Sequence, residues 1–269
     1  MAPIWTIGGA SVRGASHLRS GKPNQDALAW HPPAGVAARV VGAVSDGHGA
    51  RAHFRSADGA RIAVEQAIAR LTRLIAEPES DEANAALAGD ILRAWRRAVD
   101  ADAAGRPYSA EEAALLTGPR LGAYGATLLT LAAEEDALTI LQIGDGDLML
   151  GYPDGRIERA LRSDAGLVGE ETYSLCQEDA ETRFRVTSLW RTDEAHWPDF
   201  ALLATDGVSK SYRDDAAFEG AVARLRDLAR SDWGELMSSL PAWLEELSGK
   251  GSGDDATLCL AIRTQPKTT

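Results

Sequence analysis

The chain has 269 residues, of which 45% are hydrophobic and 25% are charged, and its formal net charge is -12. This composition is typical of a folded globular protein and argues against general disorder. The negative balance excludes nucleic acid and an anionic membrane surface as partners, because both require a basic face.

The chain contains two cysteines, Cys176 and Cys259, which are far apart in the sequence. We expect two reduced thiols and a cytoplasmic protein. Residues 1–5 form no signal-peptide pattern, and there is no apolar run of about 18 residues that would predict a membrane span.

Short apolar runs separated by turn residues fill the first part of the chain and predict strands. The strand that ends at Ser45 is predicted to be the central one. We expect strands at residues 4–11, 26–30 and 36–45, a bulge or turn at Gly8-Gly9, a loop over residues 14–24 and a hairpin-like turn at residues 32–35.

Helical spacing of apolar residues follows, and then a series of short strands whose brief connections predict antiparallel hairpins. Pro241 is expected to kink or divide the last helix. We place helices at residues 53–76, 81–102, 111–116, 216–229 and 233–247, strands at residues 125–133, 137–143, 147–152, 156–161, 183–190, 200–204 and 258–262, an irregular segment over the site at residues 163–182, and a frayed tail at residues 265–269.

The order of these elements indicates the fold class. Strands lie at both ends and in the middle of the chain, with two helix blocks between them, so the order is not a β-α-β alternation. It predicts an α+β protein in which an antiparallel sandwich is covered by helices. We expect a single domain over residues 1–269, because the candidate site residues are spread along the chain and must meet.

Residues 40–49, Val-Val-Gly-Ala-Val-Ser-Asp-Gly-His-Gly, combine an apolar strand with a polar turn. The pattern places Asp46 at the end of a buried strand, where Gly47 and Gly49 allow a sharp turn or a close approach to a ligand. Carboxylate and carbonyl oxygens are the ligands that magnesium and manganese prefer. Taken alone, however, Asp-Gly is more typical of a plain turn.

The same pattern recurs beside three other predicted strands. Four acidic turns that converge at one end of a sheet repel one another unless cations neutralise them. The sequence therefore predicts a site with more than one divalent metal ion. The three further turns are Gly144-Asp145-Gly146-Asp147, Thr205-Asp206-Gly207 and Gly253-Asp254-Asp255.

Six short motifs span nearly the whole chain: Asn24-Gln25-Asp26, Asp46-Gly47-His48-Gly49, Gly125-Ala126-Thr127, Gly144-Asp145, Thr205-Asp206-Gly207 and Asp254-Asp255-Ala256-Thr257. In this order they resemble the motifs of the metal-dependent protein phosphatases of the protein phosphatase 2C type. Gly14-x-x-His17 is similar to a bacterial branch of that family, which carries His where better-known members carry Arg. The resemblance implies a four-layer α-β-β-α sandwich, with two antiparallel sheets flanked by helix pairs.

The same resemblance implies the metal ligands of two or three Mn²⁺ or Mg²⁺ ions. Asp46 bridges the first two ions, and the carbonyl oxygen of Gly47 joins the second. Asp206 and Asp254 complete the coordination of the first ion. Asp145, together with Asp206, binds a third ion more weakly. Each aspartate taken singly is also typical of a turn or a cap, so the prediction rests on the set.

Three further residues receive roles in catalysis from the resemblance. Asp26 holds waters on the second metal. His48 protonates the leaving alkoxide, although a histidine there is equally typical of a hydrogen bond that sets the loop. His17 replaces the phosphate-gripping Arg with a single-point donor, which predicts weaker phosphate binding. Arg13 and Arg19 flank His17 and either compensate for that loss or are plain surface charges.

The remaining polar residues are predicted to have smaller parts. Gln25 stands where many family members carry Glu, so it offers an oxygen without charge, and a loose second metal is expected. His31, His53 and His196 lie outside the motifs and receive no role. No cluster of Cys and His with ligand spacing points to zinc.

Together these assignments predict a bacterial-type serine/threonine phosphoprotein phosphatase, in which a water activated by a dinuclear Mn or Mg centre attacks the phosphoester. The expected substrates are phosphorylated proteins, produced by a cognate Ser/Thr kinase, and we expect a monomer. One alternative, motivated by His17 and Gln25, is a catalytically weak phosphatase-like regulatory or phosphoprotein-binding module. Another is a metallohydrolase of small phosphate esters. Exchange of residues 163–182 tests this alternative, because it should alter substrate selectivity only if macromolecular substrates pack on that segment.

Overall fold

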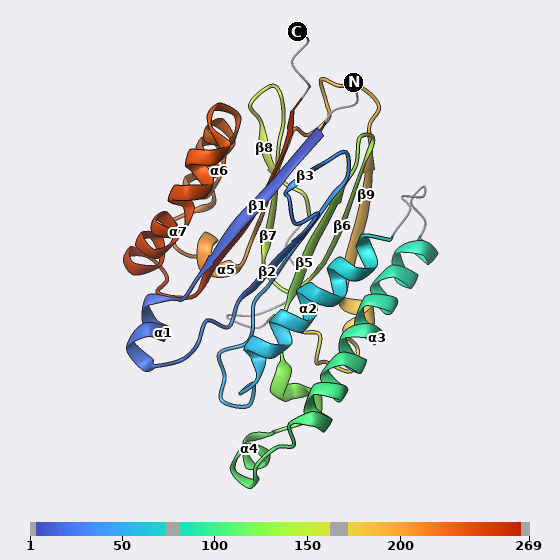
Figure 1. Ribbon diagram of the computed structural model, residues 1–269, viewed down its shortest axis with the longest axis vertical. Helices are drawn as coiled ribbons and strands as arrows, with labels where there is room; N and C mark the ends of the chain where they lie inside the picture. Colours follow the sequence, from blue (N-terminus) through green and yellow to red (C-terminus); the bar gives the residue numbers. More distant parts are fainter. Residues whose placement is uncertain (1–3, 74–80, 162–171, 265–269) are drawn as a thin grey trace.

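Two antiparallel sheets packed face to face form the centre of the computed structural model, which describes residues 4–73, 81–161 and 172–264 (Figure 1). In hydrogen-bonding order, the six-stranded sheet contains β3 (Val36–Ala37), β1 (Ile4–Val12), β11 (Ala256–Thr264), β10 (Phe200–Ala204), β7 (Asp147–Gly151) and β8 (Ile157–Arg159). The five-stranded sheet contains β2 (Ala27–His31), β4 (Val40–Ser45), β5 (Leu128–Ala133), β6 (Ala137–Ile143) and β9 (Arg185–Trp190).

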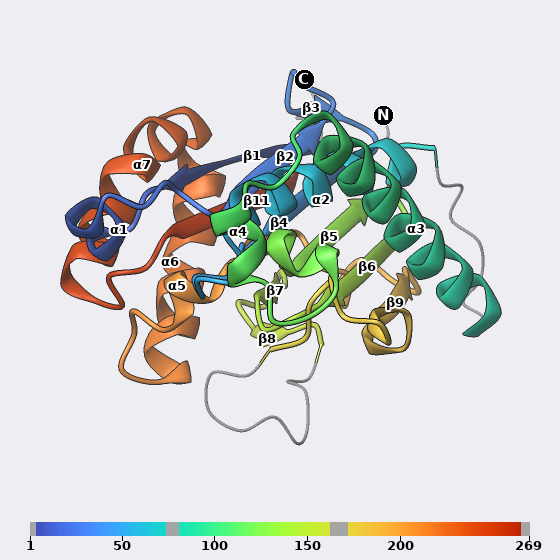
Figure 2. The ribbon, with the colours of Figure 1, turned by 90° about the horizontal axis from the view of Figure 1, so that it is seen from below.

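Helix pairs cover the outer faces of both sheets (Figures 1 and 2). α2 (Ser56–Leu71) and α3 (Asp81–Gly105) pack on the five-stranded sheet, and α6 (Asp215–Ser231) and α7 (Trp233–Lys250) pack on the six-stranded sheet. The predicted four-layer α-β-β-α sandwich is therefore confirmed. Short helices lie in the connections: α1 (Ala15–Ser20), α4 (Ala110–Leu115), α5 (Asp206–Ser209), and the 3₁₀ turns Arg120–Tyr124 and Ala180–Arg183.

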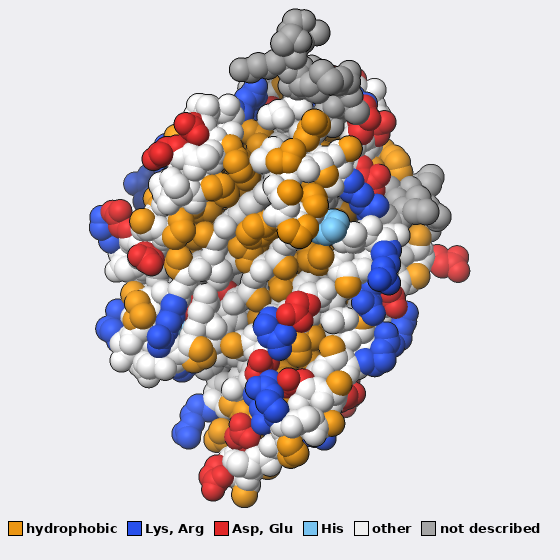
Figure 3. Space-filling model, viewed as in Figure 1, with side chains coloured by type: hydrophobic (Ala, Val, Ile, Leu, Met, Phe, Trp, Pro, Cys, Tyr) orange, Lys and Arg blue, Asp and Glu red, His pale blue; other side chains and the backbone are white. Residues whose placement is uncertain are grey.

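Successive side chains of a strand point to opposite faces of its sheet, and this alternation produces the layers. In β4, Val40 and Val44 point into the core between the two sheets, whereas Val41 and Ala43 pack against α2 and α3. All six residues of β4 are buried, which explains why this strand reads as a continuous apolar run rather than an alternating one. The surface between α7 and α2, where the edge strands β2 and β3 lie, shows hydrophobic side chains in Figure 3.

The strand predicted over residues 36–45 is wrong in one respect, because it is two strands that belong to different sheets. β3 pairs with β1, whereas β4 pairs with β2 and β5. Arg39 lies in the bend between the two strands, and its side chain donates to the Leu71 carbonyl oxygen at the end of α2. The turn at residues 32–35 is present, but the strands that it joins, β2 and β3, do not pair with each other.

A second crossing replaces one of the predicted hairpins. The β5–β6 and β7–β8 hairpins are confirmed, but β6 and β7 lie in different sheets. Gly144, with a φ of 101°, turns the chain between them in a conformation that favours glycine. Asp145 is therefore held at the end of the sandwich, where the chain passes from one sheet to the other.

Three smaller expectations also differ from the structure. The loop predicted over residues 14–24 contains α1. No bulge occurs at Gly8-Gly9, because β1 stays in register with β11 throughout, and a Cβ at Gly9 would lie 2.1 Å from the Leu258 carbonyl oxygen. α7 continues through Pro241 as one helix.

The predicted helix over residues 53–76 is shorter in the structure, where it begins at Ser56 and ends at Leu71. Residues 74–76 of that prediction, residues 162–171 of the irregular segment and the tail at residues 265–269 lie outside the described residues. Within the described part of the chain, no helix combines the length and the apolar character needed to cross a bilayer.

Candidate metal centre

One end of the sandwich contains a cavity of about 810 Å³ to which all four acidic turns contribute. Asp46 follows β4, Asp145 follows β6, Asp206 begins α5 directly after β10, and Asp254 precedes β11. This end, which carries α1 and α5, is toward the viewer in Figure 2. The structure thus brings together the four aspartates that the sequence predicted as metal ligands.

The loop after β4 is fixed by its neighbours. The backbone N–H of Asp46 donates to Thr127 Oγ1 over 3.0 Å, and its carbonyl oxygen accepts from the Thr127 N–H over 2.8 Å. A Cβ at Gly47 would lie 2.6 Å from the Gln25 carbonyl oxygen and 2.7 Å from that of Ser56, so only glycine fits there. These contacts hold Asp46 and Gly47 at the cavity wall.

Burial and mutual repulsion raise the pKa of the cavity carboxylates. For Asp46, burial is the largest cause, and the charges of Asp26, Asp206 and Asp254 raise the pKa further. Burial is also the first cause of the raised pKa of Asp145 and of Asp254, and the charge of Asp206 adds to it in both cases. A cluster of carboxylates in this state is stabilised by a bound cation.

Two buried oxygen atoms of cavity residues have no hydrogen-bond partner among the described residues. They are Asp206 Oδ1 and Gln25 Oε1. An unpaired buried acceptor costs about 1–3 kcal/mol, so such atoms normally have a ligand. Carboxylate and amide oxygens are typical donors to Mg²⁺ and Mn²⁺. The donor set therefore fits a divalent metal ion.

Gln25 is oriented so that its amide oxygen stays available. Its Nε2 donates to Ser56 Oγ over 2.5 Å and to the His48 carbonyl oxygen over 3.2 Å. Both amide hydrogens are therefore used inside the protein, and Oε1 is left for the cavity. Gln25 Oε1 is therefore an uncharged oxygen at the cavity wall, although the sequence analysis did not assign Gln25 as a metal ligand.

Asp26 is not among the residues that line the cavity. Its Oδ2 accepts from the Thr205 and Thr257 hydroxyls, each over 2.7 Å. Burial raises its pKa, although these two hydrogen bonds act in the opposite direction. A carboxylate behind the wall can orient groups in the cavity, and the supporting role of Asp26 stays a prediction.

His17 lies on α1 and is tied to a residue that received no role from the sequence. His17 Nδ1 is 2.9 Å from Asp255 Oδ2, and its Nε2 is 3.8 Å from Asp254 Oδ1. Asp255 also accepts from the backbone N–H groups of Gly14 and Gln25, each over 2.6 Å. The buried Asp255 thus joins α1 to the wall of the cavity, and the Asp254-Asp255 pair in the sequence was the available signal.

His48 lines the cavity beside a second histidine. Its ring centroid is 5.0 Å from that of His53, and burial together with the charge of His53 lowers the pKa of His48 to about 4. The side chain that binds a nearby carbonyl oxygen is that of His53, whose Nδ1 lies 2.5 Å from Gly122 O. His53, to which the sequence analysis gave no role, thus lines the cavity together with His48, and no motif in the sequence marked it.

Lys210 is the one lysine or arginine among the described residues that line the cavity. Its Nζ donates to Asp206 Oδ2 and is 3.7 Å from Asp145 Oδ2. Arg13 and Arg19 do not line the cavity, and Arg13 instead donates to the His17 carbonyl oxygen over 3.0 Å. The sequence analysis missed Lys210, because it predicted no helix after Asp206, whereas the structure has α5 there with Lys210 as its C-cap.

Three comparisons place this geometry among known proteins. Residues 13–245 match the family model described as Protein phosphatase 2C. Serine/threonine-protein phosphatase 3 of Escherichia coli (strain K12) is 26% identical over 210 residues, which cover 77% of this chain and 74% of that protein.

Solved structures share the fold. The catalytic domain of the serine threonine protein phosphatase PstP in complex with two manganese ions has a TM-score of 0.59 at 21% identity, covering 98% of this chain and 100% of that one. Serine/threonine phosphatase Stp1 from Staphylococcus aureus has a TM-score of 0.62 at 15% identity, covering 97% and 95% of the two chains.

Proposed function

The chain belongs to the protein phosphatase 2C family, and we propose that it is a metal-dependent serine/threonine phosphoprotein phosphatase. The observation that carries this proposal is the convergence of Asp46, Asp145, Asp206 and Asp254 on one cavity. The unpaired, buried Asp206 Oδ1 supports it further, as does the likeness to a named serine/threonine phosphatase.

We infer that Asp46, the Gly47 carbonyl oxygen, Asp206 and Asp254 hold two manganese or magnesium ions, and that Asp145 lies at the position to which the family resemblance assigns a third ion. When bound, such ions lower the pKa of a water and stabilise charge on a phosphoryl group. The strand ends hold these carboxylates in place at the cavity.

Three further residues, Asp26, His17 and His48, are proposed to assist the hydrolysis of the phosphoester. Asp26, held by two threonine hydroxyls, orients groups at the wall. His17, oriented through Asp255, offers its Nε2 to phosphate. His48 is proposed to protonate the leaving oxygen. Because its pKa is about 4, the imidazole is neutral at pH 7 and must first take up a proton.

We also propose that residues 1–269 form one domain, since side chains from His17 to Asp254 line the same cavity. A cytoplasmic location, a monomeric state and a cognate Ser/Thr kinase that makes the substrates belong to the same proposal. The two free cysteines, Cys176 and Cys259, support the location.

The alternative of a catalytically weak binding module is not favoured, because a module without turnover gains nothing from four clustered carboxylates that repel one another. A hydrolase of small phosphate esters uses the same metal centre and differs in substrate alone. The experiment below therefore includes both kinds of substrate.

The test measures manganese-dependent hydrolysis of para-nitrophenyl phosphate and of a phosphothreonine peptide by the wild type and by Asp206→Asn. Asp227→Asn is the matched control, because Asp227 is an exposed aspartate on α6. We expect metal-dependent turnover of both substrates, lost in Asp206→Asn and retained in the control. Absence of turnover from folded, manganese-loaded wild type contradicts the proposal, and turnover of the small ester alone supports the small-ester hydrolase.

A further inference from the structure

A second cavity, of about 420 Å³, adjoins the metal centre and differs from it in character. The two cavities share His53, Cys176 and Gln177, so they are continuous with each other. Whereas the metal cavity is acidic, this one is lined mostly by apolar groups. A ligand held at the metal centre thus has an apolar space directly beside it.

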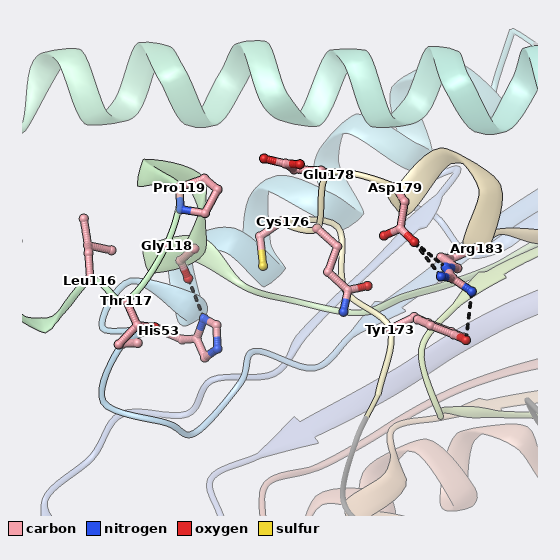
Figure 4. Close-up of a pocket in the computed structure, with 13 residues that line it drawn as sticks. His53, Leu116, Thr117, Gly118, Pro119, Tyr173, Cys176, Glu178, Asp179 and Arg183 are labelled. Atoms are coloured by element: carbon pink, nitrogen blue, oxygen red, sulfur yellow. Dashed lines mark hydrogen bonds and ion pairs between the residues drawn. The ribbon is translucent and has the colours of Figure 1, made fainter. Parts of the chain in front are cut away.

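Two loops form the walls of this second cavity, as Figure 4 shows. The segment that contains Leu116 and Pro119 lies on one side, between α4 and the next 3₁₀ turn. The segment from Tyr173 to Arg183 lies on the other side, and it carries Cys176. Burial raises the pKa of the Cys176 thiol, which therefore stays neutral and contributes an apolar surface.

Polar contacts within the walls keep the cavity open. Arg183 pairs with Asp179 over 2.6 Å and donates to the Tyr173 hydroxyl over 3.0 Å. On the opposite side His53 Nδ1 lies 2.5 Å from the Gly122 carbonyl oxygen. The cavity is thus formed before any ligand binds, which reduces the entropy cost of binding.

The charges at this cavity argue against an anionic ligand. Arg183 is engaged by Asp179, and Glu178 adds a further carboxylate. No other lysine or arginine is among the described lining residues. A second phosphate or an acidic side chain would meet a net negative surface, whereas an uncharged apolar group is accommodated without a desolvation penalty.

We propose that this cavity binds a bulky apolar side chain that flanks the phosphoserine or phosphothreonine of a protein substrate. The proposal rests on the proposed phosphatase function, because the phosphorylated residue occupies the metal cavity. Successive residues of an extended chain are about 3.3–3.6 Å apart, so a near neighbour of the phosphorylated residue reaches the adjoining space. A small ester such as para-nitrophenyl phosphate has no such neighbour.

Gly118 lines the cavity and accepts a side chain without a clash with the surrounding backbone. A Cβ at Gly118 would have no atom within 4 Å, so Gly118→Trp places an indole in open space at the cavity. Gly105 at the end of α3 provides the matched control, because its Cβ position is equally free and it does not line the cavity.

The experiment compares phosphothreonine peptides in which one flanking position at a time is changed from Leu to the isosteric Asn. For wild type, we expect kcat/KM to favour Leu over Asn by about tenfold at one position. In Gly118→Trp this preference should fall to about one, while Gly105→Trp retains it. Hydrolysis of para-nitrophenyl phosphate should be equal in all three proteins.

Two results overturn the apolar subsite and leave the phosphatase function intact. One is equal kcat/KM for the Leu and Asn peptides at every flanking position in wild type. The other is a Leu preference that survives Gly118→Trp. If manganese-loaded wild type hydrolyses neither peptides nor para-nitrophenyl phosphate, the phosphatase function itself fails, and the subsite with it.

A separate observation concerns the number of metal ions. The two oxygens of Asp206 are used differently: Oδ1 is buried and has no partner among the described residues, whereas Oδ2 accepts from Lys210 Nζ. The same ammonium group lies 3.7 Å from Asp145 Oδ2. Lys210 thus stands between the two carboxylates to which the family resemblance assigns a third metal.

We infer that the Lys210 ammonium group takes the place of a third divalent ion, so that this chain binds two ions. A fixed positive charge between Asp145 and Asp206 satisfies both carboxylates and repels a further cation. Lys210 is four residues from Asp206, which places both side chains on the same face of a helix. The inference rests on the proposed metal centre.

Manganese stoichiometry tests this inference without reference to activity. The electron paramagnetic resonance signal of free Mn²⁺ gives the number of ions bound per chain in wild type, Lys210→Met and Lys250→Met. Lys250 is the matched control, because it pairs with Glu246 at the same spacing of four residues, on α7 and away from the cavity. We expect two ions in wild type and the control, and a third, bound at least about tenfold more tightly than in wild type, in Lys210→Met.

A third ion bound with equal affinity by wild type and Lys210→Met overturns the assignment of Lys210 alone. If no protein binds manganese, the metal centre of the proposed function fails first. Circular dichroism of each variant shows whether it is folded. If a variant is unfolded, the number of ions bound by the wild type still tests the inference, which predicts two.

Discussion

The two ends of strand β10 each carry an aspartate, and the two are neutralised in different ways. Asp199, before the strand, accepts from Arg226 Nε over 2.8 Å and from Arg226 Nη2 and Arg230 Nη1 over 2.7 Å each. Asp206, after the strand, has an unpartnered Oδ1 and faces other carboxylates, including that of Asp46.

The difference distinguishes a structural charge from a binding charge. A partly buried carboxylate that is fully paired inside the chain, such as Asp199, has no affinity left for a ligand. A group of carboxylates that raise one another's pKa, such as those around Asp46, is still able to bind an external cation and is stabilised by it. Four predictions test this contrast, from the largest effect to the smallest.

Asp46→Asn should lower manganese-dependent kcat/KM by about a thousandfold, because it removes the carboxylate shared by the proposed metal ions, worth several kcal/mol of transition-state stabilisation. Steady-state hydrolysis of para-nitrophenyl phosphate measures the loss. Because Asp46 forms no ion pair among the described residues, and burial with neighbouring carboxylates raises its pKa, the metal-free variant should be at least as stable as the wild type. A destabilised, still active Asp46→Asn would make this carboxylate structural, like Asp199.

Asp199→Asn should show the opposite behaviour. It leaves the buried Arg226 without its carboxylate and should lower the free energy of unfolding by about 3 kcal/mol, as measured by urea denaturation. Arg230→Met is the matched control: the Arg230 side chain is 51% exposed, so its loss should cost about 1 kcal/mol or less. Manganese affinity should be unchanged in both variants, and a weakened metal site in Asp199→Asn would refute the contrast.

His48→Asn should reduce turnover according to the leaving group. Phosphothreonine releases a strongly basic alkoxide that needs a proton, so hydrolysis of the peptide should fall by about a hundredfold. Para-nitrophenolate leaves without protonation, so hydrolysis of its ester should fall much less. Parallel measurement of both substrates separates the two cases, and equal losses would assign His48 a role in holding the loop rather than in proton transfer.

The pH dependence of stability should be the smallest effect. The pKa of Asp46 is raised in the folded protein, so the native state binds this proton more tightly than the unfolded chain does. Lowering the pH from neutral toward the ordinary aspartate value therefore stabilises the metal-free protein through this group. Bound manganese should reverse the sign, because protons then compete with the metal.

Thermal unfolding at pH 7.5 and 5.5, in chelator or in excess manganese, measures this effect. Asp46→Asn serves as the reference, and the difference between wild type and variant isolates Asp46 from other titrating groups. Identical responses of the two proteins in chelator would show that Asp46 does not carry the pH dependence.

Local patterns predicted most strands and the acidic turns at their ends. β6 (Ala137–Ile143) and β10 (Phe200–Ala204) match the predicted strands residue for residue, because every residue in them is buried and turn residues follow each largely apolar run. The aspartates of the metal centre could be predicted for the same reason, since a charge directly after such a run must lie at the end of the sandwich.

The two crossings between the sheets could not be predicted in this way. β3 and β4 read as one strand, and β6 and β7 read as a hairpin, yet in each case the members lie in different sheets. The hydrophobic pattern indicates that a residue is buried. Because both sheets bury their inner faces in one shared core, the pattern does not show to which sheet a strand belongs.

The sequence by itself determined the α+β sandwich class, most of the strands and the set of carboxylates, because these follow from local burial and from residue types that suit one chemistry; the four layers were implied by the family resemblance. The tertiary structure alone decided that Asp255 orients His17, that Lys210 stands between Asp145 and Asp206, and that an apolar cavity adjoins the metal centre. Those features depend on contacts between residues far apart in the chain or on side-chain direction, and neither is recorded in the order of neighbouring residues.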